Sequence, residues 1–228
     1  LGSNQTNYVT STGRSYNWYM DQYNTGEHSG VNCGPTSITM AIKWADGTFN
    51  KTPENARETF RPSGGWWYTD DIKNYLDLYN IANYTFKVDG SSSLIKQEID
   101  NDKILIFCID ASKISYNTNS SQHVDNFYKN VTGHFIVGKG YTKINNILYI
   151  EVYDPFSMNK KYLNTNQKKG ENRYIKWSQL SQAISTWWNY AFAVTPKSRT
   201  STVSSDVRNP NIVNIEDIEH MPGGISIK

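Results

Sequence analysis

Residues 34–44 read Gly-Pro-Thr-Ser-Ile-Thr-Met-Ala-Ile-Lys-Trp and predict a helix with one buried face. Apolar residues recur there at spacings of three and four, at Ile38, Ala41, Ile42 and Ala45. Pro35 suits the first helical turn, where its missing N–H costs nothing. Asp46 and Gly47 form a stop signal. The predicted helix therefore begins directly after Cys33.

Further helices are expected in the sequence both before and after a strand that we expect to be buried. The sequence 103–110, Lys-Ile-Leu-Ile-Phe-Cys-Ile-Asp, is a continuous apolar run typical of a strand buried on both faces. Helical patterns cover about 70–80, 93–100 and 177–188, and strand patterns cover 135–138, 147–152 and 192–194. Helices come first and strands follow. This order predicts an α+β domain in which N-terminal helices pack on an antiparallel β-sheet.

The chain has 228 residues, enough for one domain or for one domain with a tail. Residues 1–15 are polar, and we expect a flexible N-terminal segment there. Residues 16–196 carry the apolar patterns and form the expected domain. Residues 197–228 hold little that could form a core, so we expect a polar C-terminal tail.

Composition excludes several classes of function. The net charge of +2 is too balanced for a nucleic-acid binder that relies on bulk charge. No apolar run reaches the length of a membrane span. Two cysteines and four scattered histidines predict no metal site and no cofactor. A surface rich in Asn and Tyr but poor in charge favours a secreted or cell-surface bacterial protein, although codon bias explains it equally well.

Cys33 opens the helix predicted after a loop that carries Gly26 and Gly30. A helix N-terminus offers partial positive charge and free N–H groups. Both stabilise a thiolate, which is the nucleophilic form of cysteine. The alternative is a small buried hydrophobic residue, which describes most free cysteines. Position alone leaves both interpretations open.

His134 and Asp154 stand at the ends of predicted strands. His134 could take the proton of Cys33 and later give it to a leaving amine. Asp154 could accept the second imidazole N–H and fix the tautomer. Each alone also fits a structural role, a strand-end histidine or a turn aspartate before proline. Their order along the chain, with a helix-capping cysteine, favours a catalytic triad.

Three blocks of the sequence resemble the signature blocks of C39-like peptidases, in the papain-like cysteine peptidase clan. They are Asn-Cys-Gly-Pro-Thr-Ser at 32–37, Gly-His-Phe-Ile-Val at 133–137 and Tyr-Asp-Pro at 153–155. The likeness spans about residues 16–195. It implies a papain-like fold with Cys33 as nucleophile, His134 as general base and acid, and Asp154 as the residue that orients His134.

The family also places a glutamine shortly before the cysteine. Its side chain joins the cysteine backbone N–H in the oxyanion hole, the pair of donors that stabilises the tetrahedral intermediate. Here Glu27 stands six residues before Cys33 and does not fit. Gln22, eleven residues before, is the candidate, with 24–31 as an inserted loop. The alternative is that Gln22 is an exposed loop residue.

The resemblance is to the free-standing branch of the family, without transporter domains, and it implies a peptide or protein substrate. The family name comes from domains that cut bacteriocin leaders after two glycines. In the tail, Gly223-Gly224 comes after residues at leader-like spacings, which are Val213, Asp217, Ile218 and Met221. The chain could cut itself after Gly224 or hold its own C-terminal tail as an inhibitor. The alternative is coincidence in a short amphipathic tail.

Two other features leave structural alternatives open. Cys108 lies inside the predicted strand at 103–110 and suits an inert core position, although a disulfide with Cys33 would abolish the activity. Trp66 and Trp67 cannot both point inward along a regular strand. We expect one of them in the core and one half-exposed, where it could line a cleft.

The expected function is a cysteine peptidase that hydrolyses a peptide or isopeptide bond through a thioester. One alternative uses the same triad as a cell-wall peptide amidase or transpeptidase. Another is a non-catalytic surface-binding module that retains the fold. Intact Cys33, His134 and Asp154 argue against the last, and thiol alkylation would separate it from the other two.

Overall fold

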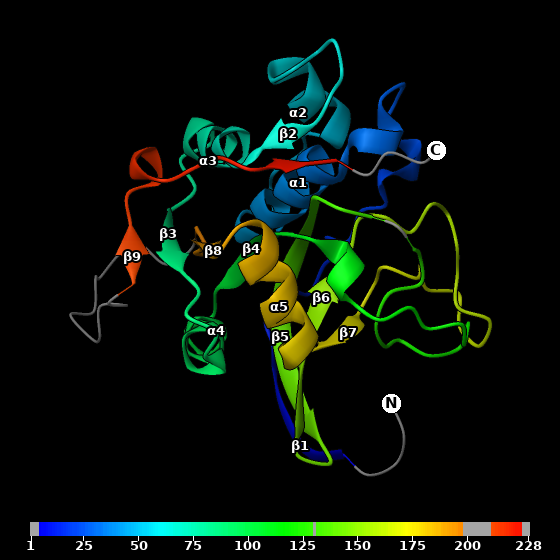
Figure 1. Ribbon diagram of the computed structural model, residues 1–228. Coiled ribbons are helices and arrows are strands. Elements are labelled where there is room, and N and C mark those ends of the chain that lie inside the picture. Colours follow the sequence, from blue (N-terminus) through cyan, green and yellow to red (C-terminus); the bar gives the residue numbers. More distant parts are fainter. Residues whose placement is uncertain (1–4, 130, 198–210, 225–228) are drawn as a thin grey trace.

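The computed structural model describes residues 5–129, 131–197 and 211–224, with side chains from residue 12 onward. Five α-helices and ten strands succeed one another along these residues (Figure 1). The helices are α1 (Cys33–Ala45), α2 (Pro53–Thr59), α3 (Thr69–Leu78), α4 (Ser92–Asp100) and α5 (Trp177–Trp187). The strands are β1 (Gln5–Ser11), β2 (Trp67–Tyr68), β3 (Asn83–Lys87), β4 (Ile104–Ile109), β5 (His134–Ile144), β6 (Ile147–Tyr153), β7 (Arg173–Lys176), β8 (Tyr190–Val194), β9 (Ile212–Val213) and β10 (Pro222–Gly223). Short 3-10 helices lie at Gln22–Asn24, Ser29–Val31, Ala111–Lys113 and Ile215–Asp217.

Eight strands form one antiparallel sheet in the order β7-β6-β5-β4-β8-β3-β9, and β1 also pairs with β5. The central strand β4 is buried at all six positions because helices cover both of its faces. Ile104, Ile106 and Cys108 pack with α1, α2 and α3. Leu105, Phe107 and Ile109 pack with α4 and α5 on the opposite face. The expected α+β class, with N-terminal helices on an antiparallel sheet, is therefore confirmed, and two later helices cover the second face.

The expectation of a flexible N-terminal segment over 1–15 differs from the structure. Residues Gln5–Ser11 form β1, which pairs with the 140–144 half of β5. The shorter β4 pairs only with the 134–138 half, so the remaining edge of β5 would otherwise be unpaired. The polar sequence carries no sign of this pairing because main-chain groups make it.

The expectation of a polar tail over 197–228 is wrong for residues 211–224. β9 adds to the sheet edge beside β3, and Ile215 is buried in the core. β10 pairs with β2, far from β9 in the fold (Figure 1). The other tail residues, 198–210 and 225–228, lie outside the described part of the chain.

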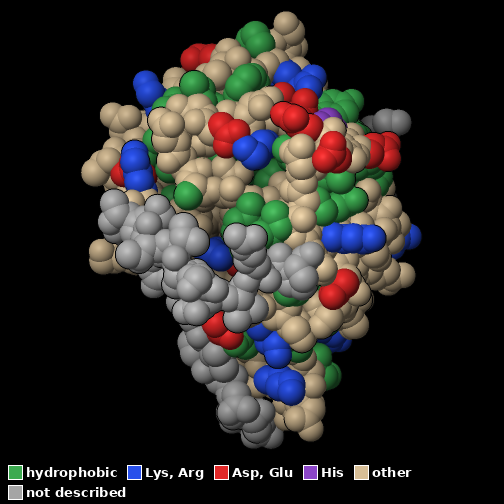
Figure 2. Space-filling model, turned by 90° about the vertical axis from the view of Figure 1, so that its left-hand side faces the viewer, with side chains coloured by type: hydrophobic (Ala, Val, Ile, Leu, Met, Phe, Trp, Pro, Cys, Tyr) green, Lys and Arg blue, Asp and Glu red, His purple; other side chains and the backbone are tan. Residues whose placement is uncertain are grey.

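The surface agrees with the balanced charge of the sequence. On the face that Figure 2 presents, acidic and basic side chains alternate over the described surface and no large block of one sign gathers there. In the described part of the chain, no helix has the length and apolarity needed to cross a membrane.

Gly34 sets how closely α1 approaches the rest of the fold. A Cβ at Gly34 would lie 2.7 Å from Cβ of Trp67 and 3.3 Å from a ring carbon of Phe135. We expect Gly34→Ala to lower the free energy of unfolding by about 1–3 kcal/mol, the usual cost of overpacking a rigid contact. Urea unfolding followed by tryptophan fluorescence measures it.

The matched control is Gly30→Ala, where no described heavy atom lies within 4 Å of the added Cβ. We expect this control to change stability little. Equal stability of Gly34→Ala and Gly30→Ala would contradict the close approach of α1.

Candidate active site

Cys33 is the first residue of α1 and is fully buried. The turn before it is fixed by the buried side chain of Asn32. Its Nδ2 donates to the main-chain oxygen of Thr25 (2.9 Å) and to Oγ1 of Thr25 (3.0 Å). Its Oδ1 accepts from Nε of Arg57 (2.8 Å). These bonds satisfy a buried amide and hold the start of α1 in one place.

Contacts between α1 and β5 bring Cys33 beside His134. Oγ of Ser37, one turn into α1, donates to the main-chain oxygen of Phe135 (3.1 Å). Gly34 lies close to the Phe135 ring in the same contact. His134 is the residue before Phe135 and the first of β5. The nucleophile predicted on a helix and the base predicted on a strand therefore meet at the ends of their elements.

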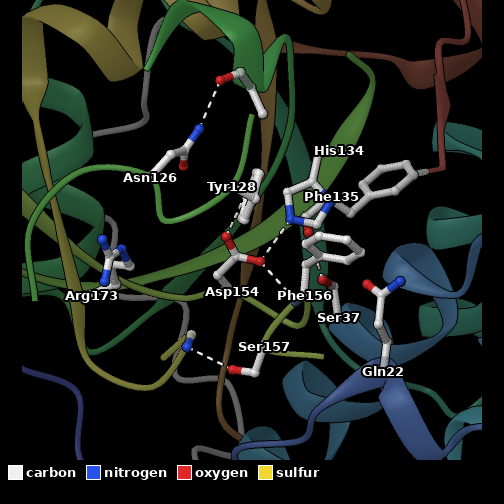
Figure 3. Close-up of polar contacts among 12 residues, drawn as sticks. Gln22, Ser37, Asn126, Tyr128, His134, Phe135, Asp154, Phe156, Ser157 and Arg173 are labelled. Carbon is white, nitrogen blue, oxygen red and sulfur yellow. Dashed lines mark hydrogen bonds and ion pairs between the residues drawn. The ribbon is translucent and has the colours of Figure 1, made fainter. Parts of the chain in front are cut away.

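His134 and Asp154 form a buried pair (Figure 3). Nε2 of His134 donates to Oδ1 of Asp154 over 2.7 Å. Nδ1 of His134 is also buried and has no hydrogen-bond partner among the described residues. The charge of Cys33 is among the influences that raise the pKa of His134. The ring therefore presents one nitrogen to Asp154 and has the other available for Cys33.

Three donors converge on the Asp154 carboxylate. Besides His134, the main-chain N–H of Phe156 donates to Oδ1 (2.9 Å) and the hydroxyl of Tyr128 donates to Oδ2 (2.6 Å). Figure 3 shows Asp154 between Tyr128 and His134. Both carboxylate oxygens are thus occupied, and Asp154 can orient His134 without turning.

The pKa values of the pair reflect this arrangement. Burial lowers the pKa of His134, but Asp154 and Cys33 outweigh burial and raise it to about 9. Burial raises the pKa of Asp154, but the charge of His134 and the three hydrogen bonds outweigh burial and lower it. At neutral pH the pair is an imidazolium next to a carboxylate.

Arg57, on α2, adds a second positive charge near Cys33. Burial lowers the pKa of its guanidinium, and the charge of Cys33 opposes that effect. Its Nη2 also donates to the main-chain oxygen of Val31 (3.3 Å). Arg57 therefore supports the loop before Cys33 and places a positive charge near the thiol.

Gln22 is buried near the site, so the alternative of an exposed loop residue is wrong. Its main-chain N–H donates to the oxygen of Pro155 (2.8 Å), the residue after Asp154. Its side-chain Nε2 donates to the main-chain oxygens of Ser29 (2.9 Å) and Gly30 (3.4 Å). Its Oε1 is buried and has no partner among the described residues. In Figure 3 its amide is turned toward the side on which His134 lies.

The remaining sequence expectations concern Cys108 and the two tryptophans. Cys33 and Cys108 are both free and buried. Burial, followed by the charge of Cys33, raises the pKa of Cys108 well above its ordinary value, which makes that thiol a poor nucleophile. Trp67 is fully buried and Trp66 is half-buried, as expected.

Sequence reasoning missed Tyr128, Phe156 and Arg57. The spacing of Phe156 from Asp154 was readable, because an aspartate commonly accepts from the N–H two residues later. Tyr128 lies in a loop of polar residues and Arg57 in a different helix, and nothing in the local sequence links either to the site.

The comparisons with known proteins identify the family and the fold. The model of the Peptidase_C39 like family matches residues 16–183. A crystal structure of a candidate C39-like peptidase from Bacillus anthracis superposes with a TM-score of 0.55 at 11% identity. That match covers 83% of this chain and 98% of the other. The comparison with curated proteins found no match.

The carboxylate of Asp154 is the strongest influence that raises the pKa of His134. We expect Asp154→Asn to lower that pKa from about 9 to the ordinary value of about 6.5 or below, because burial then acts against a weaker opposing charge. An NMR titration of the histidine ring protons measures it.

Tyr128→Phe is the matched control for this titration. It removes one hydrogen bond from Asp154 and leaves the carboxylate in place, so the pKa of His134 should fall less. A His134 pKa that stays near 9 in Asp154→Asn would contradict the pairing.

Proposed function

Because the chain belongs to the Peptidase_C39 like family, we propose that it is a cysteine peptidase that hydrolyses peptide bonds with Cys33 as the nucleophile. The observation that carries this proposal is the His134 ring, which Asp154 holds at Nε2 and which has Nδ1 available for the thiol. This arrangement supports roles for Cys33 as nucleophile, His134 as base and Asp154 as orienting residue.

The reaction needs only groups that the site provides. The Cys33 sulfur attacks the carbonyl carbon of the substrate, and the resulting tetrahedral intermediate collapses as the C–N bond breaks. His134 gives its proton to the leaving amine, and a thioester remains. Water, deprotonated by His134, then attacks the thioester and releases the acid and the free thiol. Asp154 keeps its charge throughout and stabilises the imidazolium.

The oxyanion of each intermediate needs two donors. The first N–H groups of α1 have no partner inside the helix and supply one of them. For the second we propose the side chain of Gln22, which lies beside the loop that leads to Cys33. For this role its amide would exchange the Ser29 and Gly30 carbonyls for the oxyanion.

Gln22→Glu tests that assignment, because it keeps the shape and removes the donor. We expect hydrolysis of a mixed peptide library to slow by about 10²–10³-fold, measured by mass spectrometry of the products. Gln22→Glu also loses the hydrogen bonds to the Ser29 and Gly30 carbonyls, so we expect the urea midpoint to fall. Alkylation of Cys33 should remain faster than that of Cys108, because Cys33 and His134 are unchanged. Alkylation of Cys33 that slows as much as hydrolysis would show that Gln22 is a structural residue instead.

Alkylation tests the nucleophile itself, with Cys108 as an internal control of equal burial. Below about pH 9 the ring of His134 is protonated and its charge favours a thiolate at Cys33. We expect iodoacetamide to label Cys33 at least about tenfold faster than Cys108, and to do so below the ordinary thiol value of about 8.5. Peptide mass spectrometry measures both rates.

The control for alkylation is His134→Ala, which should slow labelling at Cys33 and leave Cys108 unchanged. Equal, slow labelling of both cysteines in the unmodified chain would contradict the proposed function.

A further inference from the structure

The C-terminal part of the described chain lies against the catalytic residues. We call residues 219–224 the tail strand, since it contains β10 and runs along β2 (Figure 1). Pro222 and Gly223 pair antiparallel with Tyr68 and Trp67. The N–H of Thr69 donates to the oxygen of Met221 (3.1 Å). One side of the tail strand is therefore held by main-chain pairing.

The opposite side of the tail strand is held by the catalytic strand and its neighbours. The N–H of Gly224 donates to the main-chain oxygen of Gly133 over 2.7 Å. Gly133 directly precedes His134, so Gly224 lies beside the catalytic base. Nε1 of Trp187 donates to the oxygen of Pro222 (2.9 Å). Both edges of an extended peptide are thus bonded through its main chain.

The two glycines are required by the residues that face them. A Cβ at Gly223 would lie 2.3 Å from a ring carbon of Phe135. A Cβ at Gly224 would lie 2.1 Å from a ring carbon of Trp66. Both distances are far below any contact that real Cβ atoms make, and aromatic rings can move only as whole units. Only a residue without a side chain fits either position.

Some proteins bind a peptide by strand addition. The peptide is extended, its main chain pairs with a strand of the protein, and the surrounding side chains select which residues fit. The tail strand binds in this way next to the catalytic pair, and Gly224 is its last described residue. The carbonyl group of Gly224 is two bonds from its N–H, so it lies within the same region as His134. The tail strand thus has the position of the acyl side of a substrate.

We propose that this chain is its own substrate and cuts itself in cis after Gly224. The inference rests on the proposed function. The Cys33 sulfur bonds to the carbonyl carbon of Gly224, the bond to the nitrogen of Ile225 breaks, and His134 protonates the released amine. Water then cleaves the thioester, which leaves a carboxylate on Gly224 and restores the Cys33 thiol.

The contacts of the tail strand also determine the fate of the cut chain. Its bonds to β2, Gly133 and Trp187 all involve residues up to Gly224, so they remain after cleavage. The product therefore stays in place as a cis inhibitor, and another peptide enters only when the tail strand detaches.

Intact mass spectrometry of the purified full chain tests the inference. We expect the unmodified chain to end at Gly224 and Cys33→Ala to retain Ile225 and every residue after it. Addition of the unmodified chain to Cys33→Ala should leave Cys33→Ala uncut, because cleavage is in cis. An unmodified chain that keeps Ile225 overturns the inference, and so does cleavage of Cys33→Ala in the mixture.

Variants at the tail strand test the fit of the glycines. Gly224→Ala should remain uncut, since its methyl group meets the Trp66 ring. Trp66→Ala in the same chain should restore cutting because it removes that ring. The matched control is Glu216→Ala, an exposed side chain before the tail strand, which should be cut like the unmodified chain. Normal cutting of Gly224→Ala would overturn the assigned position of Gly224.

Failure of the inference and failure of the proposed function give different results. If Cys33 labels fast and the peptide library is hydrolysed while the chain keeps Ile225, only the self-cleavage is wrong. If Cys33 labels as slowly as Cys108 and the chain keeps Ile225, both are wrong.

Discussion

The contact between α1 and β5 is the constraint on which the site depends. Cys33 lies on a helix and His134 on a strand, and neither element alone brings the two together. Gly34 lets the helix approach the Phe135 ring, and the Ser37 hydroxyl bonds to the Phe135 carbonyl within the same contact. Because a packed interior leaves few voids, this contact restricts where the Cys33 side chain can lie relative to His134.

Burial of charge is the cost of that arrangement, and hydrogen bonds offset it. An ionised carboxylate taken out of water is stable only when its oxygens are satisfied. Asp154 receives three donors, and two of them, Tyr128 and the N–H of Phe156, contribute no chemistry of their own. They keep Asp154 charged, which keeps the pKa of His134 near 9 although burial acts against it. The pKa of His134 thus depends on residues that bond to Asp154 and not to the ring itself.

The sequence was informative where side chains determine structure. The apolar spacing of α1, the continuous apolar run of β4 and the positions of Cys33, His134 and Asp154 at element ends were all readable, because each arises from local pattern. β1 and β10 could not be predicted from the sequence. Main-chain hydrogen bonds form both strands, and their sequences show no apolar alternation. Tyr128 and Arg57 were also unreadable, because they reach the site only through the tertiary fold.

The main-chain pairing of the tail strand determines how strongly this segment is held. A short segment with two glycines buries little apolar surface, and as a separate peptide it would bind weakly. Attached to the same chain, it binds at an effective concentration in the millimolar range or above, with no added contact. The anchors of this attachment are β9 on the sheet edge and the Trp188 Nε1 bond to the oxygen of Glu219. The chain's own glycines therefore fill the space beside Gly133, and any other peptide that binds there must compete with them.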